Sequence, residues 1–159
     1  MIRNISLALT FLTISSPAFA LSCMRPDVVS MLEFARKSED VYYVIKGRVT
    51  PTSPYTIPEP KNGADSSVST PVVISGTGLG QRSFSVPVEV GAIAKLNCLS
   101  VWCAGPPAEG ELLMILRKSD EELILDVGPC GGTAISWSVE AEKRLLGCHR
   151  SGKCERGEF

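Results

Sequence analysis

The spacing of apolar residues changes twice along the chain, first after residue 37 and again near residue 138. Apolar residues recur at helical spacing directly after Asp27, which suits a helix N-cap, so the sequence predicts a short amphipathic helix over residues 27–37. The next segment, DVYYVIKGRVT over Asp40–Thr50, is dense in β-branched and aromatic residues. It predicts a long strand with a bulge at Gly47.

Shorter strands are predicted over the middle of the chain. Gly76, Gly78 and Gly80 lie between two apolar runs, which indicates a strongly bent strand of the kind found at a barrel corner. A phosphate-binding turn is the alternative for these glycines, but no helix start follows them. A charged turn separates two later apolar runs, which predicts a hairpin. The runs are PVVIS (71–75), RSFSVPVEVGAIAKLNC (82–98), LLMILRK (112–118) and LILDVGPCGG (123–132).

A second helix is predicted over Ser138–Cys148. Ser138 suits an N-cap, and the acidic Glu140 precedes the basic Lys143 in the order that the helix dipole favours. Short strands with glycine corners between two helices predict a mainly β fold. We expect a small, closed or nearly closed β-barrel with an N-terminal and a C-terminal helix.

The segment Pro51–Thr70 breaks the strand pattern. It contains four prolines, an Asn-Gly pair and several serines, a composition that cannot sustain a strand ladder. We expect a long exposed loop between two strands. Such a loop is either a contact element or slack.

Residues 1–20 have the three parts of a secretory signal peptide. Arg3 supplies a positive charge, an apolar run follows over Ile5–Ile14, and an Ala-Phe-Ala motif ends the segment. Cleavage after this motif would leave a single domain over residues 21–159, and no other segment approaches the length of a membrane span. We therefore expect a periplasmic or secreted protein.

An alternative cut lies just before Cys23. In that case Ala20-Leu21-Ser22-Cys23 would be a lipobox, and acyl chains on Cys23 would anchor the protein. Bacterial lipoboxes usually have Leu where this chain has Ala20. The cut that leaves Leu21 as the first mature residue is therefore preferred.

The charge of the chain excludes one class of partner. The net charge is −1, and it falls by one when Arg3 leaves with the signal peptide. No basic stripe is present to neutralise phosphates, so we expect no nucleic-acid partner.

Six cysteines follow the signal peptide, which in an exported chain indicates three disulfides. Cys148 and Cys154 are so close that a local loop is their simplest pairing, and it would staple the tail. Cys98 and Cys103 lack the C-x-x-C spacing of redox pairs, so a structural bond is expected for them as well. The six are Cys23, Cys98, Cys103, Cys130, Cys148 and Cys154.

The chain offers little catalytic chemistry. His149 is the sole histidine, and we expect it in the tail loop, facing solvent, so no catalytic residue is predicted. Asp126 and Glu89 are expected to be solvated strand-end charges. Zinc held by Cys148, His149 and Cys154 is an alternative, but an oxidised loop is preferred in an exported protein, and no metal or cofactor is predicted.

Three motifs from Cys23 onward resemble the netrin-like module of tissue inhibitors of metalloproteinases and related bacterial exported domains. They are SEDVYYVIKGRV (38–49), WCAGPPAEGELLMIL (102–116) and LILDVGPCGG (123–132), behind an N-terminal cysteine and a short helix. The resemblance covers most of residues 23–148, and it implies an OB-fold barrel. It also implies a disulfide between Cys23 and Cys130, which leaves Cys98 to pair with Cys103.

The inhibitory mechanism of that family does not carry over directly. Those inhibitors chelate a protease's zinc with the free amine and carbonyl of a terminal cysteine in a Cys-x-Cys start. This chain has one cysteine there, and the preferred cut places Leu21 and Ser22 ahead of it.

The leading hypothesis for function is therefore an exported, non-catalytic domain that binds another exported protein. The contact elements would be the helix-side face near Cys23 and the loop over Pro51–Thr70. A metalloproteinase inhibitor of the netrin-like type and a lipid-anchored envelope protein are the alternatives.

Overall fold

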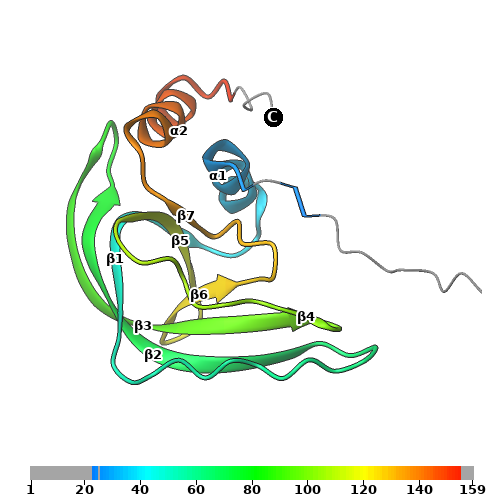
Figure 1. Ribbon diagram of the computed structural model, residues 1–159. Coiled ribbons are helices and arrows are strands. Elements are labelled where there is room, and N and C mark those ends of the chain that lie inside the picture. The colour runs from blue at the N-terminus through cyan, green and yellow to red at the C-terminus, as the bar shows by residue number, and fades with distance from the viewer. Residues whose placement is uncertain (1–22, 25, 155–159) are drawn as a thin grey trace, which may run out of the picture.

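The computed structural model describes residues 23–24 and 26–154 (Figure 1). The predicted signal peptide over 1–20 lies outside the described residues. Of the alternative lipobox, Ala20-Leu21-Ser22-Cys23, only Cys23 is described.

The first helix, α1, spans Val28–Lys37 and confirms the prediction from the sequence. The carboxylate of Asp27 caps it by accepting a hydrogen bond of 3.2 Å from the Ser30 N–H. Basic residues in the last turn suit the negative end of the helix dipole. One face of α1 is buried, and its buried residues are Val28, Val29, Met31 and Leu32.

Five strands form a closed ring. Each strand pairs with the next in the order β1-β2-β3-β6-β5, and β5 pairs back to β1. The pairs are antiparallel except for β3 and β6, which run parallel. The ring strands are β1 (Tyr42–Pro51), β2 (Ser66–Leu79), β3 (Phe84–Leu99), β5 (Leu112–Lys118) and β6 (Leu123–Val127).

Two short strands and a second helix complete the fold. Strand β4 (Trp102–Cys103) pairs with β3, and β7 (Ala134–Ser136) pairs with β5. Helix α2 spans Val139–Ser151 and lies beside α1 above the ring (Figure 1). The prediction of a mainly β fold with a helix near each end is confirmed.

Strand β2 begins earlier than the sequence predicted. The expected loop over Pro51–Thr70 ends at residue 65, because Ser66–Thr70 pair with β3 from Cys98 to Ala94. The serine-rich composition of this segment did not indicate a strand. Its side chains alternate in exposure, with Ser67 and Ser69 exposed and Thr70 buried. The ladder between β2 and β3 curves along one side of the molecule up to α2, which agrees with the expected bent strand (Figure 1).

Strand β5 is buried on both faces, and this arrangement divides the core in two. Its even-numbered residues face the inside of the ring, whereas Leu113 and Ile115 face the two helices. The five residues Leu112, Leu113, Met114, Ile115 and Leu116 are each at most 1% exposed. Coverage of both faces explains why the run is continuously apolar rather than alternating.

The second helix is longer than predicted. It continues past Cys148 to Ser151 and ends at Gly152, whose φ of 69° suits a glycine C-cap. Strand β7 was not predicted, since a three-residue strand carries no periodicity.

A polar cluster joins α2 to β1. The Glu142 carboxylate accepts hydrogen bonds from Lys46 Nζ at 2.9 Å and from Trp137 Nε1 at 2.7 Å. Burial raises the pKa of Glu142. The two hydrogen bonds and the ammonium charge of Lys46 together lower it by more, so the pKa lies below its ordinary value. A separate ion pair of 2.7 Å joins Arg144 Nη2 to the buried Asp27, which connects the two helices.

Strands β1 and β2 approach closely at two glycines. Gly47 and Gly76 are partners in a regular register, so the bulge predicted at Gly47 is wrong. A register shift lies instead between Gly78 and Leu79 of β2, in the pairing of that strand with β3. A Cβ on Gly47 would overlap the Ser75 carbonyl oxygen, which belongs to the rigid backbone of β2.

We expect Gly47→Ala to lower the free energy of unfolding by about 1–3 kcal/mol, because the new methyl group must force β1 and β2 apart. Gly91→Ala is the matched control, since Gly91 lies in β3 with open space around its Cβ position. Its effect should stay within about 0.5 kcal/mol. Urea denaturation of the oxidised proteins measures both, and equal stabilities of the two variants would contradict the close-approach argument.

Candidate functional site

Three disulfides connect the described cysteines. The pairs are Cys23–Cys130, Cys98–Cys103 and Cys148–Cys154, and no described cysteine is free. They are the pairs expected from the local spacing and from the resemblance. Zinc ligation by Cys148 and Cys154 is not compatible with their disulfide, because zinc binds cysteine as the thiolate.

The loop between β1 and β2 is fixed rather than slack. The backbone N–H groups of Lys61 and Gly63 each donate a hydrogen bond of 3.2 Å to Ser100, to its carbonyl oxygen and its Oγ respectively. Pro58 is buried, and Tyr55 packs against the core inside the ring. The loop over 52–65 is therefore held as one ordered surface segment.

The turn that receives this loop is itself constrained. Residues Cys98 and Cys103 are cross-strand partners of β3 and β4, and their disulfide closes the hairpin between them. Ser100 within the turn has a φ of 55°, a left-handed conformation that non-glycine residues rarely adopt. The disulfide and the hydrogen bonds from the loop both stabilise this conformation.

We call the surface formed by the loop 52–65, the turn 99–102 and the Cys23–Cys130 disulfide the disulfide edge. A hollow of about 380 Å³ is lined by Asp65 of the loop, by Leu99 of the turn and by Pro129, the neighbour of Cys130. The hollow thus joins the loop to the turn that carries Cys130, whereas no residue of the helix-side face near Cys23 lines it. Three exposed apolar side chains lie on the loop and the turn, namely Ile57, Leu99 and Val101.

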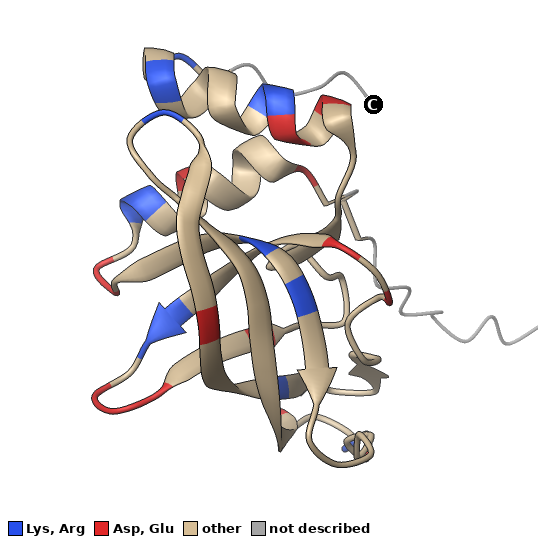
Figure 2. Ribbon diagram, turned by 90° about the vertical axis from the view of Figure 1, so that its left-hand side faces the viewer, with Lys and Arg blue, Asp and Glu red and all other residues tan. Residues whose placement is uncertain are grey.

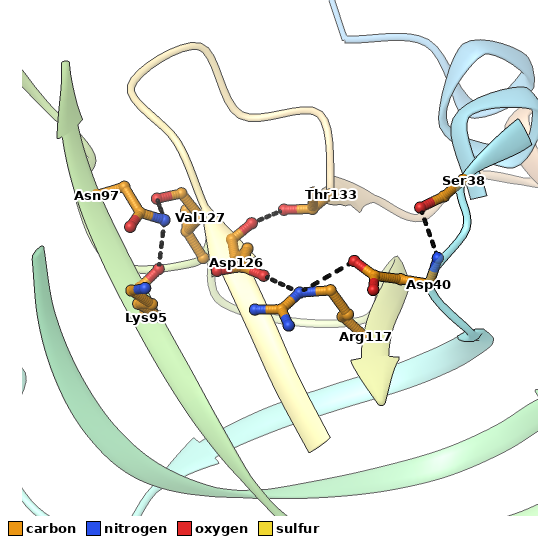
Figure 3. Close-up of polar contacts among 8 residues, drawn as sticks. All are labelled: Ser38, Asp40, Lys95, Asn97, Arg117, Asp126, Val127 and Thr133. Atoms are coloured by element: carbon orange, nitrogen blue, oxygen red, sulfur yellow. Dashed lines mark hydrogen bonds and ion pairs between the residues drawn. The ribbon is translucent and has the colours of Figure 1, made fainter. Parts of the chain in front are cut away.

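Polar contacts anchor β6 and the turn that leads to Cys130 (Figure 3). Arg117 Nε donates to Asp126 Oδ2 at 3.0 Å, and Thr133 Oγ1 donates to the Asp126 carbonyl oxygen. Asn97 Nδ2 donates to the Val127 carbonyl oxygen at 3.3 Å. The expectation of a solvated Asp126 is therefore wrong, because its side chain and backbone both hold neighbouring strands, whereas Glu89 is exposed as expected.

The expectation that His149 faces solvent in a tail loop is wrong. It lies in α2, where its Nδ1 is 3.2 Å from Arg36 Nη2 and its Nε2 is 3.1 Å from the Gly80 carbonyl oxygen. The guanidinium can only donate, so Nδ1 accepts and Nε2 donates to Gly80. Arg36 Nη1 also lies 3.8 Å from both sulfurs of the Cys148–Cys154 disulfide. The histidine therefore fastens the tip of the β2–β3 hairpin to the helices.

A groove of about 770 Å³ opens beside this hairpin tip. Most of its wall is apolar, and the wall combines residues from α1, β1, the β2–β3 hairpin and the β5–β6 turn. No pattern in the sequence predicted this groove. The alternation of Val86, Val88 and Val90 was the available signal, but no local pattern showed that β1 and β2 part beside them.

Comparison of the chain with protein-family models, curated proteins and solved structures gives no match. Within residues 23–24 and 26–154, no helix has the length and apolar content needed to cross a membrane. The same residues contain no cluster of three or more histidine, cysteine, aspartate or glutamate side chains that could hold a metal ion.

Replacement of both Cys98 and Cys103 by serine should loosen the disulfide edge. The hairpin turn would lose its cross-link, and the hydrogen bonds from Lys61 and Gly63 to Ser100 would then break more often. We expect faster tryptic cleavage after Lys61 and a loss of stability of about 2 kcal/mol. A variant with Cys148 and Cys154 both replaced by serine is the control, and it should leave cleavage after Lys61 unchanged. Equal cleavage in all three proteins would show that the disulfide does not order the loop.

Proposed function

We propose that this protein is an exported, non-catalytic domain that binds another exported protein through the disulfide edge, and that its ring is an OB-fold barrel. The ring order with one parallel pair, β3 and β6, supports the fold assignment, because five strands in a Greek-key order make up that barrel. Three disulfides support an oxidising compartment, either the periplasm or the extracellular space.

One observation carries the binding proposal: apolar side chains are exposed on segments that are fixed in place. Ile57 is 52% exposed, Leu99 49% and Val101 46%. A single exposed apolar residue needs no explanation, but several on two segments joined by hydrogen bonds favour an interaction surface. The hydrogen bonds to Ser100 and the Cys98–Cys103 disulfide hold them before a partner arrives, so little ordering entropy is lost on binding.

The proposal assigns no catalytic group. Both ring nitrogens of His149 are used in contacts that hold the β2–β3 hairpin. Arg117 and Asp126 bind each other, and that hydrogen bond raises the pKa of Arg117. These polar groups act on the structure of the domain.

Leu99→Asp should abolish binding of the partner, because a charge on the disulfide edge must be desolvated in the complex. Val139→Asp is the matched control, since Val139 is 71% exposed on α2 and belongs to neither candidate surface. Cross-linking in the exporting cell, followed by affinity purification, measures the complex. Excess untagged wild-type protein should compete for the partner, whereas the Leu99→Asp protein should not. Retention of the partner by Leu99→Asp would remove this surface from the proposal.

A second candidate is inhibition of a metalloproteinase in the netrin-like manner. The Cys23–Cys130 disulfide favours it, because that bond fixes the start of the described chain to the turn after β6. This mechanism needs Cys23 as the terminal residue with a free amine.

Terminal sequencing and intact mass of the exported protein distinguish these candidates. We expect Leu21 as the first residue, and this result would exclude chelation by the Cys23 amine. A free amine on Cys23 would support the inhibitor instead, and acyl mass on Cys23 would support a lipid-anchored envelope protein.

A further inference from the structure

The groove beside the β2–β3 hairpin lies where β1 and β2 separate. Pairing of these strands begins at Ile45 with Gly78, while Tyr42–Val44 pair with β5 alone. Leu79, the last residue of β2, pairs only with β3, and the β2–β3 hairpin continues from there toward α2 (Figure 2). All of Tyr42–Val44 line the groove, so the edge of β1 that β2 has left faces it.

The groove is apolar along its length. Val86, Val88 and Val90 are alternate residues of β3 and project from the same face of that strand. Tyr43 lies opposite on β1 and is 46% exposed, and Val86 is 52% exposed. A volume of about 770 Å³ is in the range of ligand sites in proteins.

Acidic residues are in excess at one end of the groove. The β5–β6 turn contributes Asp120, Glu121 and Glu122, all exposed, and no ion pair is made by them within the described part of the chain. Acidic turns stand out at one side of the molecule in Figure 2. Arg36 lines the groove from α1, where its guanidinium contacts His149 rather than a carboxylate. Lys118 and Arg36 thus stand against three carboxylates among the groove residues, which leaves the acidic residues in excess.

We propose that this groove binds an extended peptide segment of another protein, with alternate apolar side chains on the valines of β3 and a lysine or arginine at the β5–β6 turn. An open strand edge offers backbone hydrogen bonds to an extended chain, and an apolar wall offers pockets for every second side chain. The three carboxylates select a cation at one end of that chain. This site is separate from the disulfide edge, since the two lie at opposite ends of the β2–β3 ladder.

The hairpin wall of the groove is already fixed in the unbound protein. The hydrogen bond from His149 Nε2 to the Gly80 carbonyl oxygen and the contacts of Arg36 hold the hairpin tip on the helices. A peptide would therefore meet a formed site, which lowers the entropic cost of binding.

Selection from a phage-displayed library of random dodecapeptides on the full oxidised protein tests this proposal. Enriched sequences should alternate apolar and polar residues and carry lysine or arginine at one end. Val86→Asp should abolish the enrichment, because it places a charge in the apolar wall. Val139→Asp and Leu99→Asp should keep the enrichment. Enrichment on the Leu99→Asp protein would show that this site is separate from the disulfide edge.

A synthetic copy of the best peptide then tests the recognition chemistry by calorimetry. A protein with Glu121→Lys and Glu122→Lys should bind it about tenfold more weakly, and should bind better when the basic residues of the peptide are replaced by glutamate. N-methylation of alternate peptide nitrogens should weaken binding to wild-type protein, because strand pairing needs those N–H groups.

Three results would overturn the proposal. The first is no enrichment above that of Val86→Asp, and the second is binding that ignores both charge reversal and N-methylation, as expected for a small apolar ligand site. The third is a wild-type dimer in sedimentation that Val86→Asp converts to monomer, since a second copy of the chain would then fill the groove.

Discussion

The fold depends on the burial of β5 from both sides. Most antiparallel strands in small domains turn one face to water, and their sequences alternate accordingly. Here one face of β5 lies inside the ring and the other under two helices, so five consecutive residues are apolar and nearly inaccessible. The helices must stay in place for this arrangement to hold. The Asp27–Arg144 ion pair joins them, and Lys46 and Glu142 tie α2 to β1.

The segments that extend past this double core need other means of support. The β2–β3 ladder continues beyond its pairing with β1, and the loop 52–65 leaves the ring at the other end. The hairpin tip is held by His149 and Arg36, while the loop is held by Ser100 in a disulfide-closed turn. Each candidate surface therefore lies on a projecting segment that specific contacts fix to the main body.

The sequence predicted the features that arise from local chemistry. Asp27 as an N-cap, the apolar run of β5 and the paired spacing of Cys148 and Cys154 each act within a few residues, so a pattern in the chain reveals them. The pairing of Cys23 with Cys130 was expected only through a resemblance, since those residues are 107 positions apart.

Features that depend on distant partners were missed. Ser66–Thr70 become a strand because β3 supplies the opposite edge, and their serine-rich composition gives no sign of this. Asp126 meets Arg117 and His149 meets Gly80 only after the strands have paired and the hairpin has curved back. The groove was the hardest feature to predict. It exists because the pairing of β1 with β2 ends at Ile45, and the sequence of neither strand indicates where that pairing ends.

The separation of core and surfaces has a consequence for the evolution and engineering of this domain. The exposed Leu99 and Val86 belong to neither buried cluster, whereas the residues that hold their segments, such as Ser100 and His149, act through hydrogen bonds to backbone groups. A change in an exposed side chain can therefore alter what is bound while the double core keeps its stability. A change in a fastening residue would instead release the whole segment and alter every contact on it. In the proposed binding, specificity would thus reside in the exposed side chains, and affinity would depend also on the disulfide and hydrogen bonds that order them beforehand.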